Sequence, residues 1–525
     1  MLRKLGLILA LGLVLRIGFL TVSPPELFGD EIDVGYQAYS LLKTGQDIYR
    51  QTMPFYIHSL AEWRAPLLTY ATVPTIALAG LNEYGVRLPE VIFGVLGIAI
   101  LFLLIKQTTN SVTLSLWVSV TLAMMPWHIH YSRAAFEVVL MLDLIMLGTL
   151  LFIKKRFLLG FILFALSMYT YSTAMLFVPI WIGYLLIKEK AFPILQGLVF
   201  GLLITPLIYF IFLGPARDRF GILSLTNNRE IIDKVFTLRK ESSSPYIKFF
   251  VNKYFMVGGE WFMNYLRPFS SEFLFVRGDP VMRHSIQVIG QLLPLTAPFL
   301  LIGLYTLAKK KQWLWLVWLA LAPIPASMTS DGGYHATRLF LMVPPLAVFI
   351  GSGLSQFKNK LLISVTCVLI STQLLWVSYY YLNHYAKQSW RWWHVGYKNI
   401  LTQTPAISGD YSRIFINNTY EPSLMRFLFW TKYDPVKFHK NFTVDKAMEN
   451  IVPGYDGFSL DGKYFFGSFN GKEKLFQPNA LYMISQREDV AGDWDWRESP
   501  PENIELLGSS QNSYGQAVFY LVTKK

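Results

Sequence analysis

Residues 5–22, LGLILALGLVLRIGFLTV, form an almost uninterrupted apolar run, and Phe28-Gly29-Asp30-Glu31-Ile32-Asp33 follows shortly after it. Such a run is typical of a membrane-spanning helix. Two adjacent carboxylates at its exit are costly near hydrocarbon and therefore indicate function. The run also has the outline of a signal peptide, but it contains Arg16 and lacks a clear small-x-small cleavage site. We interpret it as a retained first span.

The composition is that of a polytopic membrane protein. The 525 residues are 53% hydrophobic and 15% charged, and the mean hydropathy is +0.37. Soluble domains carry about 25% charged residues. In a soluble protein the net charge of +13 would favour nucleic acid as a partner. Here the excess lies largely in short loops, so we expect membrane lipids and no nucleic acid. The single cysteine, Cys367, excludes an internal disulfide and any CxxC motif.

Apolar runs predict about 11 transmembrane helices. They lie at residues 5–22, 88–105, 112–127, 137–153, 157–171, 174–187, 193–213, 286–308, 313–328, 338–354 and 361–381. Alternate connections carry lysines, and the positive-inside rule makes these connections cytoplasmic. The prediction is a multi-pass protein of the cell membrane with a cytoplasmic N-terminus and an extracytoplasmic C-terminus.

This topology requires that the apolar run 67–81 does not cross the membrane. Pro66 and Pro74 interrupt it. We expect a juxtamembrane helix on the outer surface. Residues 1–382 then form a transmembrane module with outer loops at about 23–87 and 214–285, and residues 383–525 form an extracytoplasmic domain.

The C-terminal 383–525 segment is polar and rich in turns. Four short runs read as strands, at residues 413–416, 463–466, 481–484 and 517–522. Residues 422–428 read as a short helix. The sequence therefore predicts a small α/β domain.

The predicted outer face gathers charged side chains close to the ends of spans. Besides Asp30 and Glu31 they include Arg64, Arg87, Arg133, Glu137, Arg283, His335 and Arg338. Guanidinium groups match phosphate oxygens, and a carboxylate can take a proton from an attacking hydroxyl. Arginine also stabilises the charge of a departing lipid phosphate. This set suits transfer of a sugar from a lipid-linked phosphate.

The order Gly29-Asp30-Glu31, Arg64-Ala65-Pro66-Leu67, Tyr84-Gly85-Val86-Arg87-Leu88-Pro89 and Ser132-Arg133 with Glu137 resembles the GT-C glycosyltransferases. The similar branch contains the protein O-mannosyltransferases and the aminoarabinose transferase of lipid A. The resemblance covers roughly residues 1–355. Where that family usually has Lys or His before Pro-Pro-Leu, this chain has Arg64-Ala65-Pro66-Leu67, which keeps a cation.

The resemblance implies a multi-span fold with outer juxtamembrane helices. It implies a polyprenyl-phosphate sugar donor, a glycan, lipid or protein acceptor, and inversion at the anomeric carbon. Asp30 takes the position of the catalytic base, with Glu31 beside it, and Glu137 takes that of the second acidic residue. Arg64, Arg87, Arg133, Arg283, His335 and Arg338 are then candidates for substrate binding. No metal or other cofactor is predicted, because His128 and His130 have no evident third ligand.

Several candidates also have a plain structural interpretation. Asp30 is a suitable N-cap for a helix that starts near Glu31, and Asp33 reads as solvated surface. Arg87 suits a helix end whose charge reaches the interface. Arg133 and Glu137 form an i,i+4 ion pair if their segment is helical.

Two other functions remain open at this point. A transporter or lipid flippase would keep polar groups near the middle of the bilayer, whereas most charges here lie at one face. A polymerase or ligase that joins lipid-linked glycans shares the donor chemistry but transfers a chain.

Overall fold

The computed structural model describes residues 1–60, 63–214, 225–242, 244, 246, 250–443, 456–468, 476–490, 492 and 494–525. Parts of the predicted loop 214–285 and of the predicted C-terminal domain lie outside these residues. The chain forms two compact units. The first unit comprises Met1–Gly18, Ala65–Leu68 and Glu90–Tyr379, and the second comprises Phe19–Arg64, Thr69–Pro89 and Tyr380–Lys525. The predicted domain boundary at residue 383 stays a prediction.

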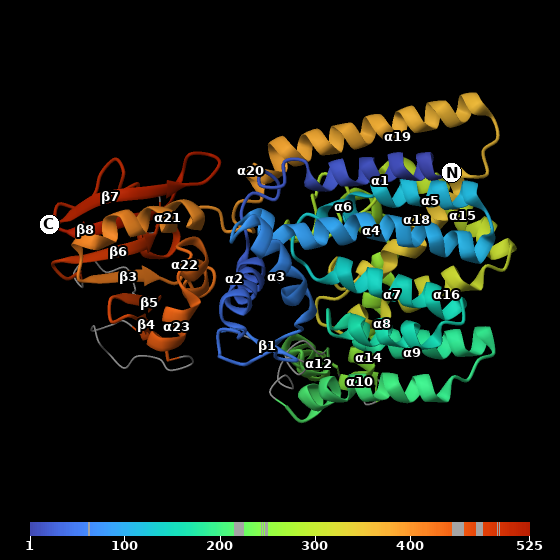
Figure 1. Ribbon diagram of the computed structural model, residues 1–525, viewed down its shortest axis with the longest axis horizontal. Helices are drawn as coiled ribbons and strands as arrows, with labels where there is room; N and C mark the ends of the chain where they lie inside the picture. The colour runs from blue at the N-terminus through green and yellow to red at the C-terminus, as the bar shows by residue number, and fades with distance from the viewer. Residues whose placement is uncertain are drawn as a thin grey trace. The chain divides into compact units, whose positions relative to one another are not determined.

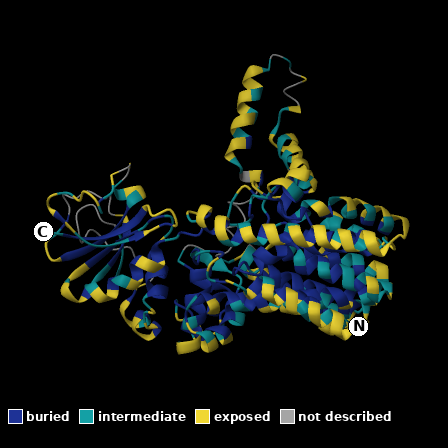
Figure 2. Cartoon of the chain, turned by 90° about the horizontal axis from the view of Figure 1, so that it is seen from above, coloured by how far each residue is buried: buried dark blue, intermediate teal, exposed yellow. Residues whose placement is uncertain are grey.

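The first unit consists mainly of apolar helices that form a bundle. Its helices are α1 (Leu2–Ile17), most of α4 (Glu83–Thr109), α5 (Val112–Met124), α6 (Pro126–Tyr131), α7 (Val138–Ile153), α8 (Phe157–Met168), α9 (Thr173–Glu189), α10 (Ile194–Phe212), α12 (Arg229–Glu241), α14 (Lys253–Leu266), α15 (Ala297–Lys309), α16 (Trp313–Leu321), α17 (Ile324–Ser327), α18 (Val343–Leu354) and most of α19 (Lys360–Tyr380). Helix α1 packs against α5, α5 packs against α18, and α18 packs against α15 (Figure 1). Figure 2 shows buried residues inside the bundle and exposed residues along its outer helices.

Three helices of the described chain are long and apolar enough to cross a membrane, at Glu83–Thr109, Ile194–Ile211 and Lys360–Gln388. Several shorter apolar helices accompany them, among them Leu67–Ala79 and Val138–Ile153. Together with the composition, they make the chain a helical membrane protein. The number of 11 spans and the orientation of the termini stay predictions.

One predicted span is wrong over its first eight residues, 286–293. The run 286–308 becomes helical only from Pro294, where a 3-10 turn over Pro294–Thr296 leads into α15. Gln287 has a φ of 62°, outside the helical region. The N–H groups of Gln291 and Leu292 donate to the carbonyls of Phe273 and Leu274 at 3.2 and 2.8 Å. Pairing with a distant segment therefore replaces the helix despite the apolar composition.

The second unit joins the first loop to the C-terminal residues. Its helices are α2 (Gly29–Thr44), most of α3 (Leu67–Ala79), α20 (Ala386–Gln388), α21 (Tyr397–Ile407), α22 (Leu424–Trp430) and α23 (Pro435–Asn441). A two-stranded hairpin pairs β1 (Ile57–His58) with β2 (Trp63–Arg64). The run 67–81 is indeed a short helix, α3; its predicted place along the membrane surface stays a prediction.

A mixed six-stranded sheet forms the core of the C-terminal residues (Figure 1). Its strands are β3 (Arg413–Asn417), β4 (Asp456–Leu460), β5 (Tyr464–Ser468), β6 (Ala480–Ser485), β7 (Ile504–Gln511) and β8 (Ala517–Lys524), in the order β4-β5-β3-β6-β8-β7. Every residue of β6 is buried, as expected for a strand covered on both faces. Phe415, Tyr482 and Phe476 stack there, with ring centroids 4.9 and 4.2 Å apart. The predicted α/β character is confirmed; β4 and β7 were not predicted.

Candidate active site

The start of α2 carries the Asp30–Glu31 pair. Phe28 precedes the helix with an extended backbone, and the Glu31 carboxylate accepts a hydrogen bond from the Phe28 N–H at 3.4 Å. Acidic side chains in a first turn interact favourably with the positive end of the helix. Gly45, with a φ of 72°, ends the helix. The N-cap residue is therefore Phe28, and the interpretation of Asp30 as the N-cap is wrong.

Asp30 shares Arg64 with a second carboxylate. Nη2 of Arg64 lies 2.5 Å from Oδ1 of Asp30, and Nε lies 3.3 Å from Oδ2 of Asp33. The Asp30 side chain is 48% exposed, whereas that of Asp33 is 8% exposed. The expectation of a solvated Asp33 is therefore wrong. Asp30 and Asp33 are three residues apart and so lie on the same face of α2, which is why one arginine reaches both.

Glu31 and Arg87 form a fully buried ion pair in the second unit. Nε and Nη2 of Arg87 donate to the two carboxylate oxygens of Glu31 at 2.9 and 3.0 Å. The remaining N–H groups donate to the carbonyls of Leu20, Pro24 and Glu26 at 2.8 to 2.9 Å. All five N–H groups of this arginine thus have acceptors within the protein. Arg87 holds the loop after the first helix against α2.

Glu26 connects this loop to the C-terminal residues. Its carboxylate accepts hydrogen bonds from the N–H groups of Gly396, at 2.8 Å, and of Lys398. These groups open α21, where an anion is favoured. Burial is the main cause that raises the pKa of Glu26 to about 7, although both backbone bonds act in the opposite direction. Sequence inspection missed Glu26, because its partners are 370 or more residues away.

The stability of the protein should depend on the protonation of Glu26. Its pKa is raised in the folded state, so the folded protein binds the proton more tightly than the unfolded chain between pH 4.5 and 7. We expect wild type to lose up to about 3 kcal/mol relative to Glu26→Gln as the pH rises through this window. Thermal unfolding of both proteins from pH 4 to 8 checks this. Parallel curves would contradict it.

Arg133 and Glu137 lie in the first unit, in the turn between α6 and α7. Nη1 of Arg133 donates to the carbonyls of Leu15 and Arg16 at 3.0 and 2.9 Å, at the end of α1. A cation is favoured at a helix C-terminus. Glu137 precedes α7 with a φ of 68°. The two residues do not share one helix, so the i,i+4 helical arrangement is wrong. A left-handed, partly exposed glutamate is a strained conformation of the kind found at functional sites.

The other three candidates lie in the loops before α15 and α18. Arg338 donates to Thr329 Oγ1 at 2.7 Å and to the Asp331 carboxylate. His335 Nε2 lies 3.8 Å from Asp331 Oδ2. Burial, followed by the charge of Arg338, lowers the pKa of His335 to about 4, so its ring is neutral at pH 7. The Arg283 carbonyl lies 2.7 Å from Nε2 of His130, which ties this loop to the turn that carries Arg133.

The described residues contain no group of three or more His, Cys, Asp or Glu side chains arranged to hold a metal. His128 Nδ1 accepts a hydrogen bond from Arg16 at 2.6 Å. The His128 and His130 side chains thus have protein partners.

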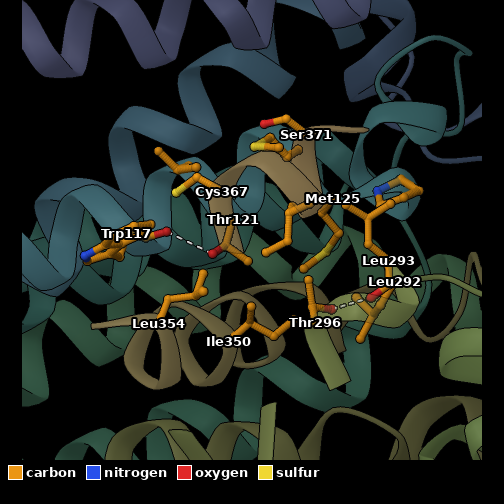
Figure 3. A pocket seen from close by; sticks show the side chains of 14 residues that line it. Trp117, Thr121, Met125, Leu292, Leu293, Thr296, Ile350, Leu354, Cys367 and Ser371 are labelled. Carbon is orange, nitrogen blue, oxygen red and sulfur yellow. Dashed lines mark hydrogen bonds between the residues drawn. The ribbon is translucent and has the colours of Figure 1, made fainter. Parts of the chain in front are cut away.

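An apolar cavity of about 130 Å³ lies in the first unit (Figure 3). Side chains from α5, α18 and α19, including Trp117, Ile350 and Cys367, line it together with Leu292, Leu293 and Thr296. Its lining suits an apolar group better than a sugar or a phosphate. None of the predicted catalytic or binding residues lines it.

The first unit is thus an apolar helical bundle, and the second unit carries a carboxylate–arginine cluster at the start of α2. Comparison with solved structures supports a GT-C-like membrane fold for the chain. The chain is similar to the crystal structure of ArnT from Cupriavidus metallidurans bound to undecaprenyl phosphate, with 12% identity, coverage of 98% of this chain and 97% of that chain, and a TM-score of 0.54. The apo state of the same ArnT matches with 11% identity, 98% and 97% coverage and a TM-score of 0.46.

The oligosaccharyltransferase of Archaeoglobus fulgidus in its apo form matches with 12% identity, 82% and 63% coverage and a TM-score of 0.47. No family model and no curated protein matches the sequence.

Proposed function

We propose that the chain is a membrane glycosyltransferase that transfers a sugar from a polyprenyl-phosphate donor to an acceptor hydroxyl, with inversion at the anomeric carbon. The observation that carries this proposal is the half-exposed Asp30 carboxylate paired with Arg64 at the start of α2. The fold shared with ArnT supports it, since that structure holds undecaprenyl phosphate. Glycan, lipid and protein hydroxyls are all suitable acceptors.

Asp30 acts as the general base in this proposal. Its carboxylate takes the proton of the acceptor hydroxyl while the hydroxyl oxygen attacks the anomeric carbon. The bond from that carbon to the phosphate oxygen breaks, and the polyprenyl phosphate leaves with the electron pair. Attack opposite to the leaving group inverts the configuration. Arg64 then has two roles: it orients Asp30, and it stabilises the charge on the leaving phosphate.

Glu31 and Arg87 support this base without touching the substrate. Glu31 is fully buried and saturated by Arg87. Because protein acceptors occupy all five N–H groups of Arg87, we favour a structural role for this residue over the predicted phosphate contact. Glu31, in turn, holds the first turn of α2 through the Phe28 N–H.

The candidate residues of the first unit have secondary roles in this proposal. Glu137, held in a strained conformation, is proposed as the second acidic residue. Arg283 and Arg338 are proposed to bind substrate phosphate, and neutral His335 to offer a hydrogen bond rather than a charge. Arg133, which holds the end of α1, is proposed to act by positioning. By the positive-inside argument, the reaction takes place on the extracytoplasmic face.

Turnover of defined donors by Arg64 variants tests the function. With polyprenyl-phosphate sugars in liposomes, wild type should release polyprenyl phosphate only when an acceptor is present. Arg64→Ala should lower kcat/KM for the donor by about 10- to 100-fold, and Arg64→Lys should lower it less, because the charge remains while the bidentate geometry is lost. Sugar-lipid flux without a new glycosidic bond, or equal kcat/KM in all three proteins, would contradict the proposal.

A further inference from the structure

The second unit places a C-terminal carboxylate against the start of α2. Glu421 lies between β3 and α22. A β-carbon added to Gly29 would overlap the Glu421 carboxylate. Further along α2, a β-carbon on Gly35 would lie 2.6 Å from Phe429 of α22. Both glycines allow the C-terminal residues to approach the α2 backbone closely.

A buried arginine holds Glu421 in this place. Nη2 of Arg426 donates to Glu421 Oε2 at 2.9 Å and to His394 Nδ1 at 2.5 Å. Nη1 lies 3.4 Å from the Leu27 carbonyl oxygen, two residues before Gly29. The Arg426 side chain is 1% exposed, and its guanidinium carbon lies 4.5 Å from the Tyr397 ring centroid. Arg426 thus contacts both the Glu421 carboxylate and the Leu27 carbonyl, and it fixes the position of Glu421 relative to the residues that precede Asp30.

The backbone around this cluster is held in uncommon conformations. His394 has a φ of 51° and Tyr420 a φ of 67°. Their rings stack with centroids 4.8 Å apart. Non-glycine residues in this region persist only where the surroundings fix them, and they concentrate at functional sites. The position of Glu421, next to Tyr420, is therefore built into the fold.

Three carboxylates lie at or beside the start of α2, and each is paired with a different arginine. The pairs are Asp30 with Arg64, Glu31 with Arg87, and Glu421 with Arg426. Glu31 is fully buried, whereas Glu421 is 35% exposed and Asp30 is 48% exposed. Glu421 therefore stands at the accessible end of the helix, next to the residue that precedes Asp30.

We propose that Glu421 is a positioning residue for Asp30. Arg426 holds the Glu421 carboxylate against Gly29. This contact fixes the backbone from which the Asp30 side chain projects. The C-terminal residues are then part of the catalytic apparatus, and their loss disables transfer even when the apolar helices are intact. This inference rests on the proposed function, in which Asp30 is the base.

A double-mutant cycle between Gly29 and Glu421 tests this inference. Gly29→Ala should lower kcat about tenfold, with the donor KM unchanged, because the new methyl group displaces the carboxylate. Glu421→Ala should lower kcat by a similar factor. Gly29→Ala should have no further effect in the Glu421→Ala background, which has room for the methyl group. In the Glu421→Gln background, where the amide fills the same volume, Gly29→Ala should remain harmful.

Thermal midpoints of the same proteins supply a readout that does not depend on activity. Gly29→Ala should lower the midpoint in wild type and in Glu421→Gln, and leave it unchanged or raised in Glu421→Ala. Additive effects on the midpoint would overturn the contact. Coupled midpoints with a kcat that none of the variants alters would overturn the positioning role. Wild type that transfers no sugar, with coupled midpoints, would instead overturn the proposed function, and the positioning role with it, while the contact between Glu421 and Gly29 would stand.

Discussion

Asp30→Asn is expected to lower kcat by about 10²- to 10⁴-fold, the range of general base catalysis. The substituted amide has nearly the shape of the carboxylate, and its oxygen still accepts a hydrogen bond from Arg64. It cannot take a proton from the acceptor hydroxyl. The loss should therefore fall on kcat, while the folded fraction and membrane insertion stay at the wild-type level. Steady-state transfer assays in liposomes measure this.

Asp410→Asn is the matched control for this substitution. Asp410 is an exposed carboxylate of the same unit, so its loss should leave transfer unchanged. Comparable activity in Asp30→Asn and wild type, with the correct donor and acceptor, would remove Asp30 as the base. A loss in Asp30→Asn that is matched by a lower thermal midpoint would point to a structural part instead.

Arg87→Ala is expected to destabilise the protein by about 3–5 kcal/mol, the cost of leaving a buried charge without its partner. Truncation leaves the Glu31 carboxylate and three carbonyls without the five hydrogen bonds that Arg87 supplies. Thermal unfolding in detergent and the yield of monodisperse protein measure this loss.

A second substitution separates the buried charge from the lost packing. Arg87→Met combined with Glu31→Gln removes both charges and should recover part of the stability lost in Arg87→Ala. Arg413→Ala, at an exposed arginine of β3, is the control and should change stability little. Arg87→Ala with a wild-type midpoint and a raised donor KM would restore the phosphate-binding interpretation of Arg87.

Local sequence patterns correctly predicted those elements whose burial follows from the composition and periodicity of their own residues. The apolar runs at 137–153 and 361–381 became α7 and α19 within a few residues. The run at 481–484 became the fully buried strand β6. In these segments, composition and periodicity agree with the burial that the fold requires.

The run at 286–308 failed because long-range pairing overrode local composition. The backbone of Gln291 and Leu292 hydrogen-bonds to Phe273 and Leu274, and the apolar content of the segment carries no sign of this partner. Asp33 failed for a related reason. Its cationic neighbour, Arg64, comes from a hairpin strand 31 residues further along the chain.

The sequence predicted the charged residues of the candidate site but not the residues that hold them in position. Asp30, Glu31 and Arg64 stood out beside an apolar run. Glu26 did not, because its hydrogen-bond partners lie 370 or more residues away. Glu421 did not, because its approach to Gly29 joins distant parts of the sequence. One signal was present: Arg426 is the only charged residue within the apolar helix LMRFLFW. A charge in such a setting indicates a buried partner.

The product of one incubation tests the central claim most directly. Wild-type protein in liposomes receives a polyprenyl-phosphate sugar of known anomeric configuration and a hydroxyl acceptor, and mass spectrometry and NMR identify the product. The proposal predicts a new glycoside of one added sugar with inverted configuration, free polyprenyl phosphate, and about 10²- to 10⁴-fold slower formation of both by Asp30→Asn. A retained configuration, a transferred chain, or equal product from Asp30→Asn would contradict it.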